Sequence, residues 1–503
     1  MGQLSSHILQ WRETQTVDPE PPEEQAGPSY ICGSRKRKRG SGPSLGPMSE
    51  THRSLNQGTN LHEVSNTRYG KKAKIISNCA YRRLFLNGET SDIKIRALGK
   101  VWCLHKMFLQ QSGYFANIIR DCWEESQNDI IELDICDQNI DVQSLHFVLG
   151  SLYRDEYISI EPLQIPGVLA VAYLLQLEDL IQQCDETMKE TISAKTVCRY
   201  YAAAETYGLD SVKQTCFEWL LHNLMTQPSV ELYKEIDIEL MNLLISSPNL
   251  LVMQKEMDVY TTLKEWVFLR FNPAWKGSMK HLLVTANNWL SKYSEQVDNI
   301  TFLETNEGII FQPVFKTLRF QHIICDLAAT KVIERDNLIP SEWLSTVYKK
   351  KWLSFLRAQQ CREIGPRHIN KAELEGYSMR CGKRIVKDGR YSWKWSGYNF
   401  GFPLHVIFTS HYIIFKQNTF RQLCEGSACT QCIRNIAFRL TLAYFDSSGN
   451  LSFSKTTGYK ILTFEKDEEQ VVMNLDSVVL NFPLYIFCNF LFILVHPEKN
   501  SEK

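Results

Sequence analysis

Apolar and polar residues follow different periods in four successive stretches of the chain. Residues 1–78 show no apolar period, and six prolines fall within the first fifty residues. A segment of this kind cannot bury enough apolar surface to offset the entropy lost when its chain becomes ordered. The pattern therefore predicts a disordered N-terminal tail, with ordered domains from residue 79 onward.

Residues 79–190 combine strand and helix periods. Three runs alternate polar and apolar side chains, the period of a half-buried strand: Asp92–Arg96, Lys100–Leu104 and Ile131–Ile135. Between the last two runs, His105–Arg120 carries apolar residues at helical steps. Asp141 precedes another apolar helical face, where its carboxylate suits a helix N-cap. We expect a compact α/β domain in this stretch.

Helix follows helix through residues 191–360. Two of the apolar stripes are Val197, Tyr200, Tyr201 and Ala204, then Val212, Cys216, Trp219 and Leu220. Asp210 precedes the second stripe and is expected to be its N-cap. Short connections such as Ser246–Asn249 indicate that neighbouring helices pack antiparallel. The pattern predicts an all-helical domain.

The period changes to that of strands over residues 361–503. Aromatic residues crowd around Trp393 and Trp395, and several β-rich runs follow: His405–Phe415, Ile436–Phe445, Leu451–Phe453 and Tyr459–Phe464. Asp446–Asn450 separates two of these runs and has turn composition. We expect a β-sandwich-like C-terminal domain, which makes the whole chain a multidomain α+β protein.

One late segment is long and apolar enough to raise the question of a membrane span. Val478–Val495 contains Asn481, Pro483 and Asn489 and is rich in aromatic and β-branched residues. This composition favours two buried strands, broken at Asn481–Pro483, over a transmembrane helix.

Composition narrows the classes of function. Lys plus Arg and Asp plus Glu both number 56, so the formal net charge is zero. That balance argues against a protein coated by nucleic acid, and we expect no direct nucleic-acid partner. Fifteen cysteines in 503 residues are too sparse for a disulfide scaffold, and their number is odd. They indicate reduced thiols of the cytosol or nucleus.

The tail carries two targeting signals. Arg35, Lys36, Arg37, Lys38 and Arg39 are five consecutive cations, which an extended chain can present to the acidic groove of an import receptor. The alternative is an ordinary solvated tail. The first six residues fit the N-myristoylation pattern, with Gly2 as the acceptor. An acyl chain and a basic cluster together would suit a protein held at the nuclear envelope or matrix.

No catalytic constellation is evident. Gly42–Gly46 matches the G-x-S-x-G motif, but prolines and glycines surround it, and no strand delivers the serine. Cys424, Cys429 and Cys432 have metal-like spacing, yet no second cysteine pair supplies a fourth ligand. We therefore expect no enzymatic activity, no metal and no cofactor.

The ordered part of the chain resembles two domains found in tandem. The segments that resemble a BTB (POZ) domain are Ser91–Ile93, Leu104–Lys106, Ser112–Phe115 and Ile130–Leu133. The residues that resemble the BACK domain of ubiquitin-ligase adaptors are Leu243, Leu244, Ser246, Leu250, Glu256, Val259, Tyr260 and Trp266. The expected domains are BTB at 79–190, BACK-like at 191–360 and the β-rich domain at 361–503. Asp92 and His105 occupy structural positions in BTB domains, so we do not expect an acid–base pair.

The whole chain resembles the germ cell-less protein family. Arg380–Lys383 and Trp393–Trp395 carry the resemblance in the C-terminal region. The family implies a substrate adaptor of a cullin-RING ubiquitin ligase, with a role in germ-cell development or spermatogenesis. Its BTB domain would dimerise and bind a cullin scaffold protein, while the C-terminal domain holds a protein substrate. We expect the homodimer to use Tyr81–Leu86 and Ser91–Arg96 as edge elements.

A short loop motif is the expected cullin contact. Trp123-Glu124-Glu125 resembles the apolar–any–Glu triplet that many BTB adaptors carry before an Ile-rich strand. An exposed aromatic such as Trp123 can anchor an interface, and Glu125 can accept hydrogen bonds from the partner. Two other functions stay open. One is a nuclear scaffold or transcriptional co-regulator that uses the BTB domain only to dimerise, and the other is an enzyme housed in the C-terminal domain.

Overall fold

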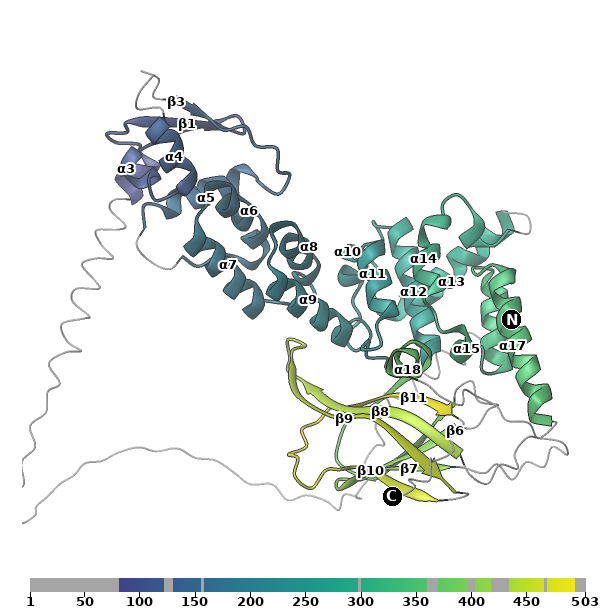
Figure 1. Ribbon diagram of the computed structural model, residues 1–503. Coiled ribbons are helices and arrows are strands. Elements are labelled where there is room, and N and C mark those ends of the chain that lie inside the picture. The colour runs from purple at the N-terminus through teal and green to yellow at the C-terminus, as the bar shows by residue number, and fades with distance from the viewer. Residues whose placement is uncertain are drawn as a thin grey trace, which may run out of the picture. The chain divides into compact units, whose positions relative to one another are not determined.

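A computed structural model describes residues 81–121, 130–154, 158–296, 300–359, 370–396, 403–417, 434–465 and 468–493. Along the chain these residues form a small sheet with helices, a long run of helices, and two four-stranded sheets (Figure 1). The predicted α+β class is confirmed.

The first region is built on a three-stranded sheet. Its strands are β1 (Ile93–Ala97), β2 (Lys100–Leu104) and β3 (Ile130–Glu132), in the order β2-β1-β3. β1 alternates buried and exposed residues, as its sequence predicts. The third expected strand is shorter than Ile131–Ile135, because β1 offers β3 pairing positions only at Lys94, Ile95 and Arg96.

Seven helical segments accompany this sheet. They are η1 (Tyr81–Leu86), α3 (Lys106–Leu109), α4 (Gly113–Asp121), α5 (Val142–Ser151), η2 (Pro162–Gln164), α6 (Ile165–Leu175) and α7 (Glu178–Glu190). The single helix expected at His105–Arg120 is wrong. The buried hydroxyl of Ser112 accepts from Phe115 N–H at 3.2 Å and donates to Leu175 O, so a new helix starts there. Asp141 caps α5 as predicted, accepting from Ser144 N–H at 2.6 Å.

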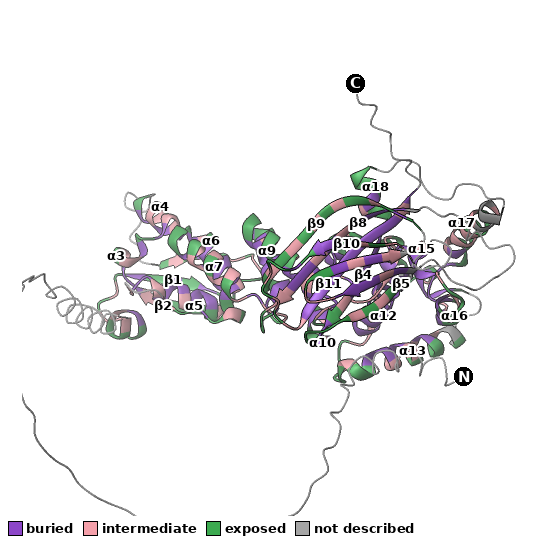
Figure 2. Ribbon diagram, turned by 90° about the horizontal axis from the view of Figure 1, so that it is seen from below, coloured by how far each residue is buried: buried purple, intermediate pink, exposed green. Residues whose placement is uncertain are grey.

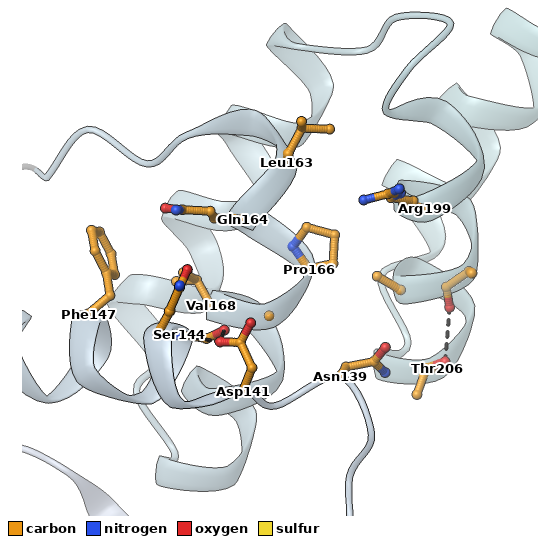
Figure 3. A pocket seen from close by; sticks show the side chains of 14 residues that line it. Asn139, Asp141, Ser144, Phe147, Leu163, Gln164, Pro166, Val168, Arg199 and Thr206 are labelled. Atoms are coloured by element: carbon orange, nitrogen blue, oxygen red, sulfur yellow. Dashed lines mark hydrogen bonds between the residues drawn. The ribbon is translucent and has the colours of Figure 1, made fainter. Parts of the chain in front are cut away.

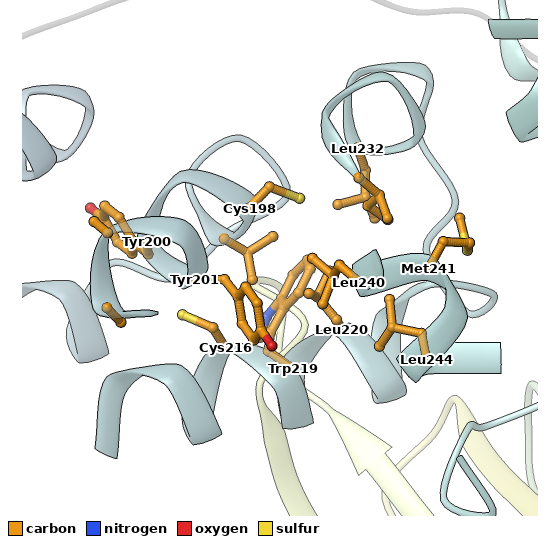
Figure 4. Close-up of a cluster of buried hydrophobic side chains, with 14 of the residues drawn as sticks. Cys198, Tyr200, Tyr201, Cys216, Trp219, Leu220, Leu232, Leu240, Met241 and Leu244 are labelled. Atoms are coloured by element: carbon orange, nitrogen blue, oxygen red, sulfur yellow. The ribbon is translucent and has the colours of Figure 1, made fainter. Parts of the chain in front are cut away.

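The second region consists of helices and short helical turns. They are α8 (Val197–Tyr207), α9 (Asp210–Asn223), α10 (Val230–Glu235), α11 (Ile238–Ser246), α12 (Glu256–Phe271), α13 (Met279–Gln296), η3 (Phe302–Glu304), η4 (Ile309–Phe311), α14 (Gln312–Lys316), α15 (Phe320–Ile323), α16 (Leu327–Asp336) and α17 (Ser341–Gln359). The two predicted stripes are buried and meet side chains of α10 and α11 (Figure 4). Asp210 is not an N-cap, because α9 already includes it and Leu209 holds the cap position.

Helix α12 lies inside this region rather than on its surface. Its residues from Glu256 to Leu269 are buried, except for the half-buried Asp258. The Lys264 ammonium donates to Asp336 at 2.5 Å, and the Tyr260 hydroxyl donates to the same carboxylate at 3.0 Å. Burial of these charges is tolerated because they are paired and hydrogen-bonded.

The third region is a β-sandwich preceded by helix α18 (Lys371–Tyr377). Its strands are β4 (Met379–Ile385), β5 (Tyr391–Ser396), β6 (Pro403–Phe408), β7 (Tyr412–Gln417), β8 (Arg434–Phe445), β9 (Leu451–Phe464), β10 (Glu469–Asn474) and β11 (Leu484–Ile493). One sheet has the order β10-β7-β6-β5, and the other has the order β4-β11-β8-β9. Their inner faces share one apolar core, as the sequence predicts for a sandwich.

Two local predictions in this region have different outcomes. The turn at Asp446–Asn450 is confirmed: Asp446 N–H donates to Asn450 O at 3.0 Å, and Gly449 adopts a φ of 83°. The pair of strands expected in Val478–Val495 is wrong, because the described part of this segment, residues 478–493, forms only β11, after Pro483. Within the described ranges, no helix is both long and apolar enough to cross a bilayer.

Candidate functional site

Most residues of the predicted partner and targeting sites lie outside the described residues. These are Gly2, the cluster Arg35–Arg39, and Trp123 with Glu125; Gly42–Gly46 and the cysteines Cys424, Cys429 and Cys432 are also outside. The described chain flanks the Trp123–Glu125 triplet on both sides, since α4 ends at Asp121 and β3 begins at Ile130. The triplet therefore stays a prediction for the segment between helix and sheet.

Asp92 and His105 have the structural roles expected of them. Asp92 Oδ1 accepts from the Lys106 N–H at 2.8 Å, at the start of α3. The His105 ring lies between the Tyr153 hydroxyl, 3.1 Å from Nδ1, and the Glu89 carbonyl, 2.9 Å from Nε2. Both ring nitrogens are engaged, so this histidine ties segments together rather than serving chemistry.

The expected dimer edges need correction. β1 is the central strand of its sheet and pairs with β2 and β3, so Ser91–Arg96 offers no free edge. Tyr81–Leu86 is helical, and its Phe85 packs in the core against Tyr153, with ring centroids 5.3 Å apart. Apolar surface remains at Leu86 and Met107, which are 53% and 70% exposed. These two side chains are part of the apolar surface that this region offers to a partner.

A pocket of about 390 Å³ opens where the first region meets the helical region. It lies between α5, the η2–α6 segment and α8 (Figure 3). Leu163, Pro166 and Phe147 supply apolar surface, while Asp141 and Arg199 supply charge. The guanidinium of Arg199 also lies 3.4 Å from Glu235. A pocket with this mixed lining can take a side chain or a short segment of a partner.

A buried ion pair joins the helical region to the sandwich. Arg380 Nε and Nη2 donate to the two carboxylate oxygens of Glu256, each at 2.9 Å, and Arg380 N–H donates to Oε1 at 2.9 Å. The third guanidinium nitrogen donates to Ile245 O and Ser247 O at 2.7 and 2.9 Å. Both side chains are fully buried. Glu256 begins α12, where the helix dipole also favours a carboxylate.

A row of side chains across the sheet extends this junction. Arg380, Asn489, Arg439 and Tyr459 are register partners on β4, β11, β8 and β9. Arg439 and Asn489 both donate to Pro248 O, at 2.9 and 2.8 Å. The Arg439 guanidinium lies 5.1 Å from the ring centroid of Tyr459. The connection between α11 and α12 therefore rests on one face of this sheet.

The ionisation of the junction follows from its burial. Burial by itself would raise the pKa of Glu256, but Arg380, with Arg319 and His322, outweighs it and lowers that pKa. Burial lowers the pKa of His322 to about 4, against the hydrogen bond that its Nε2 makes with Tyr377 O at 2.6 Å. At neutral pH the junction contains a carboxylate, two guanidinium groups and a neutral imidazole.

The junction holds the helical region and the sandwich together. Among the described residues, no group of three or more His, Cys, Asp or Glu side chains could hold a metal. In the sequence, Glu256 and Arg380 stand out only as residues that carry the family resemblance. No pattern in the sequence indicates that they form an ion pair. The local sequence gives no signal of their burial, because Lys255 and Asp258 lie close to Glu256 and Lys383 lies close to Arg380.

Comparison with known proteins agrees with this architecture. A family model for the BTB/POZ domain matches residues 81–192. The chain is 59% identical over 501 residues to "Germ cell-less protein-like 2" of Mus musculus, covering 100% of both chains. It is 57% identical to "Germ cell-less protein-like 1" of Homo sapiens, over 88% of this chain and 86% of the relative. It is 33% identical to "Protein germ cell-less" of Drosophila melanogaster, over 93% of this chain and 84% of that protein.

The fold and these matches define the class first. This is a BTB-domain protein of the adaptor type, in which a partner-binding domain is followed by helices and a sandwich. Within that class, the chain belongs to the germ cell-less protein family. BTB domains dimerise or bind other proteins, so this region is the first place to look for partners. The expected domain boundaries beyond the BTB match stay predictions.

Proposed function

We propose that this protein is a substrate adaptor of a cullin-RING ubiquitin ligase. Membership of the germ cell-less family, with a BTB domain at residues 81–192, is the observation that carries the proposal. The BTB region would bind a cullin scaffold through Trp123 and Glu125 and would form a homodimer. The sandwich would hold a protein substrate for ubiquitination and proteasomal degradation. The architecture supports this division of labour, because the BTB region, residues 81–192, and the sandwich strands, residues 379–493, are separate parts of the sequence.

Binding to a cullin tests the proposal directly. Purified full-length protein is titrated with a cullin N-terminal domain in a calorimeter, and Trp123→Ala with Glu125→Ala is compared with the unaltered chain. Loss of an aromatic anchor commonly costs about 2 kcal/mol or more, a roughly thirtyfold loss of affinity. Tyr412→Ala with Glu465→Ala, an exposed aromatic residue and an exposed glutamate of the sandwich, is the control and should bind normally. No binding by the unaltered chain would instead favour a nuclear scaffold or transcriptional co-regulator.

The pocket between α5, α6 and α8 is a second place where we assign partner binding. Leu163, on its rim, is 56% exposed, so Leu163→Asp should leave the fold intact and weaken partner binding. The same calorimetric titration reads out this variant. Unchanged affinity would remove the pocket from the interface.

We further propose a nuclear site of action in germ cells, at the nuclear envelope or matrix. The support is the Arg35–Arg39 cluster, the Gly2 acylation pattern and the germ-cell names of the relatives. Replacing the five cluster residues by Ala should abolish nuclear accumulation of the fluorescently tagged protein. Replacing Arg68, Lys71, Lys72 and Lys74 is a control of similar charge within the same tail. Persistent nuclear accumulation of the first variant would exclude the cluster as the signal.

A further inference from the structure

Strand β9 has one edge without a neighbouring strand. It runs from Leu451 to Phe464, 14 residues, and is the last strand in the order β4-β11-β8-β9. Through the described part of the chain, β9 forms backbone pairs only with β8, while side-chain hydrogen bonds link it to β10, from Gln470 to Thr463 O and from Lys455 to Asn474 O. Its side chains are largely exposed, in contrast to the buried β8 and β11 (Figure 2). A long exposed edge is a template for strand addition by another chain.

Hydrogen bonding across the sheet determines which β9 groups point outward. The main-chain N–H of Arg380 points away from β11 toward Glu256, so the pair Arg380–Asn489 exchanges no main-chain hydrogen bonds. The main-chain N–H and C=O of Asn489 therefore point the other way and bond to those of Arg439 on β8. Tyr459, opposite Arg439, must then direct its N–H and C=O to the open edge. The same alternation applies to Ile461 and Thr463. Thr463 O agrees with this, because it accepts from the Gln470 side chain on the outer side at 2.7 Å.

Two main-chain positions therefore remain open at this edge. No backbone hydrogen bond to Tyr459 or Ile461 from beyond the β8–β9 ladder occurs among the described residues. The edge closes at Thr463, where Gln470 covers the carbonyl. The stretch that could accept a strand therefore includes Tyr459 and ends before Thr463.

The side chains along this edge carry positive charge. Leu451–Phe464 contains no Asp or Glu and has lysines at positions 455 and 460. Lys455 is opposite Leu442 and Lys460 is opposite Phe438, two core residues, so both lysines belong to the same face of the strand. Lys460 is exposed, and the half-buried Lys455 donates to Asn474 O at 2.9 Å. Ile461 lies on the other face and is 56% exposed. One face thus favours carboxylates and the other favours an apolar side chain.

The same charges disfavour a second copy of this chain as the occupant. Two β9 edges paired antiparallel would bring lysines of both copies close together, and like charges opposite each other destabilise a strand pair. The bulge at Thr457 and Gly458, opposite Leu440, also interrupts the flat edge that self-pairing needs.

We propose that the β9 edge binds an extended acidic segment of a partner protein by strand addition. The partner strand would pair with the main chain of Tyr459 and Ile461. Its carboxylates, at alternate positions, would face Lys455 and Lys460, and its apolar residues would face Ile461. This inference deepens the proposed adaptor function, because it specifies the kind of substrate segment that the sandwich recruits.

The probe is a fluorescent peptide of alternating Glu and Val residues, added to the full-length protein. We expect binding by fluorescence anisotropy, and no binding of the matching Lys-Val repeat. Hydrogen exchange resolved to single amides should show new protection at Tyr459 and Ile461. The amides of Lys460 and Leu462 already point to β8 and should not change. This alternating protection distinguishes strand addition from charge attraction alone.

Two variants separate the main chain from the charge. Ile461→Pro removes an outward N–H and should weaken binding roughly tenfold. Lys455→Glu with Lys460→Glu should do so by a similar factor, even if the proline variant folds poorly. Lys280→Glu with Lys387→Glu makes the same charge change on other exposed surfaces and should bind normally.

Three results would overturn the inference. The first is no binding of the Glu-Val peptide up to about 1 mM. The second is unchanged peptide binding by both variants. The third is protection of the Tyr459 and Ile461 amides that rises with protein concentration in the absence of peptide, which would indicate self-association. Cullin titration of the same variants keeps this test separate from the adaptor proposal, because the lysine variant should bind the cullin normally whatever the peptide does.

Discussion

The two edges of the β4-β11-β8-β9 sheet differ in whether other parts of the chain cover them. At β4, the outward N–H groups of Arg380 and Gly382 donate to Glu256 Oε1 at 2.9 Å and to Gln254 O at 3.2 Å, so the helical region covers that edge. At β9, the equivalent groups of Tyr459 and Ile461 have no such cover among the described residues. A sheet edge needs either a cover or a device against unwanted pairing. Here the chain covers one edge itself and protects the other with lysines and a bulge.

The difference also separates stability from binding. The β4 edge places charges where water cannot reach them, so removing one partner leaves the other unpaired at high cost. The main-chain groups of the β9 edge are exposed to solvent, and changes there should cost little stability. We therefore expect changes at β4 to alter folding and changes at β9 to alter partner binding.

The largest effect should come from Arg380→Ala. It leaves the buried carboxylate of Glu256 without its guanidinium and should lower the free energy of unfolding by about 3–5 kcal/mol. Denaturant unfolding of the full-length protein, followed by tryptophan fluorescence, measures this. Arg384→Ala, an exposed arginine on the same strand, is the control and should change stability by about 0.5 kcal/mol or less. Similar values for the two variants would contradict a special role for the buried pair.

Gly382→Ala tests how closely the β4 edge is covered. A Cβ at this position would clash with Val252 O, a backbone atom that cannot move without shifting its loop. We expect a loss of about 1–3 kcal/mol, as for other overpacked sites. Gly376→Ala provides a control of opposite sign: nothing lies within 4 Å of its Cβ, and alanine favours helix α18. Equal stability of Gly382→Ala and the unaltered protein would show that the cover is loose.

Acid should weaken the β4 junction. The pKa of His322 is lowered by burial to about 4, from an ordinary value of 6.5, so the unfolded chain takes up this proton more readily. The stabilising contribution of His322 is complete above pH 6.5 and is lost as the pH falls toward 4. Between pH 7 and pH 5 we expect a loss of about 2 kcal/mol. Glu256, whose pKa is also lowered, adds a further loss at more acidic pH.

Thermal melting at a series of pH values checks this prediction. His322→Gln keeps a donor for Tyr377 O but cannot take up a proton. Its melting temperature should therefore fall less steeply between pH 7 and pH 5 than that of the unaltered protein. Parallel curves for the two proteins would assign the pH dependence to other groups.

The smallest effect on stability should come from Ile461→Pro at the β9 edge. Its N–H points away from β8, so proline removes no ladder hydrogen bond and should cost about 1 kcal/mol or less. Lys460→Pro, one residue away, removes an N–H that does point to β8 and should cost clearly more. Chemical denaturation of both variants measures the contrast. Equal losses would show that the assigned alternation of inward and outward groups is wrong.

Several features could be predicted from the sequence because they depend on residues close together in the chain. The Asp141 cap, the Asp446–Asn450 turn and the buried stripes of α8 and α9 each arise within one or two turns of backbone. The wrong predictions depend instead on residues that are distant in the chain and close in space. Ser112 divides the expected helix because it donates to Leu175 O, 63 residues away. β1 is central rather than an edge because β3, far along the chain, pairs beside it.

The sequence by itself determined the α+β class, the BTB resemblance and the composition of the β9 strand, with two lysines and no carboxylate. Only the tertiary structure decided that Arg380 meets Glu256, 124 residues earlier, and that β4 is covered while β9 is open. The physical reason is that periodicity, caps and turns come from short-range backbone sterics and hydrogen bonds. Strand order and buried ion pairs depend instead on which distant segments exclude water from each other.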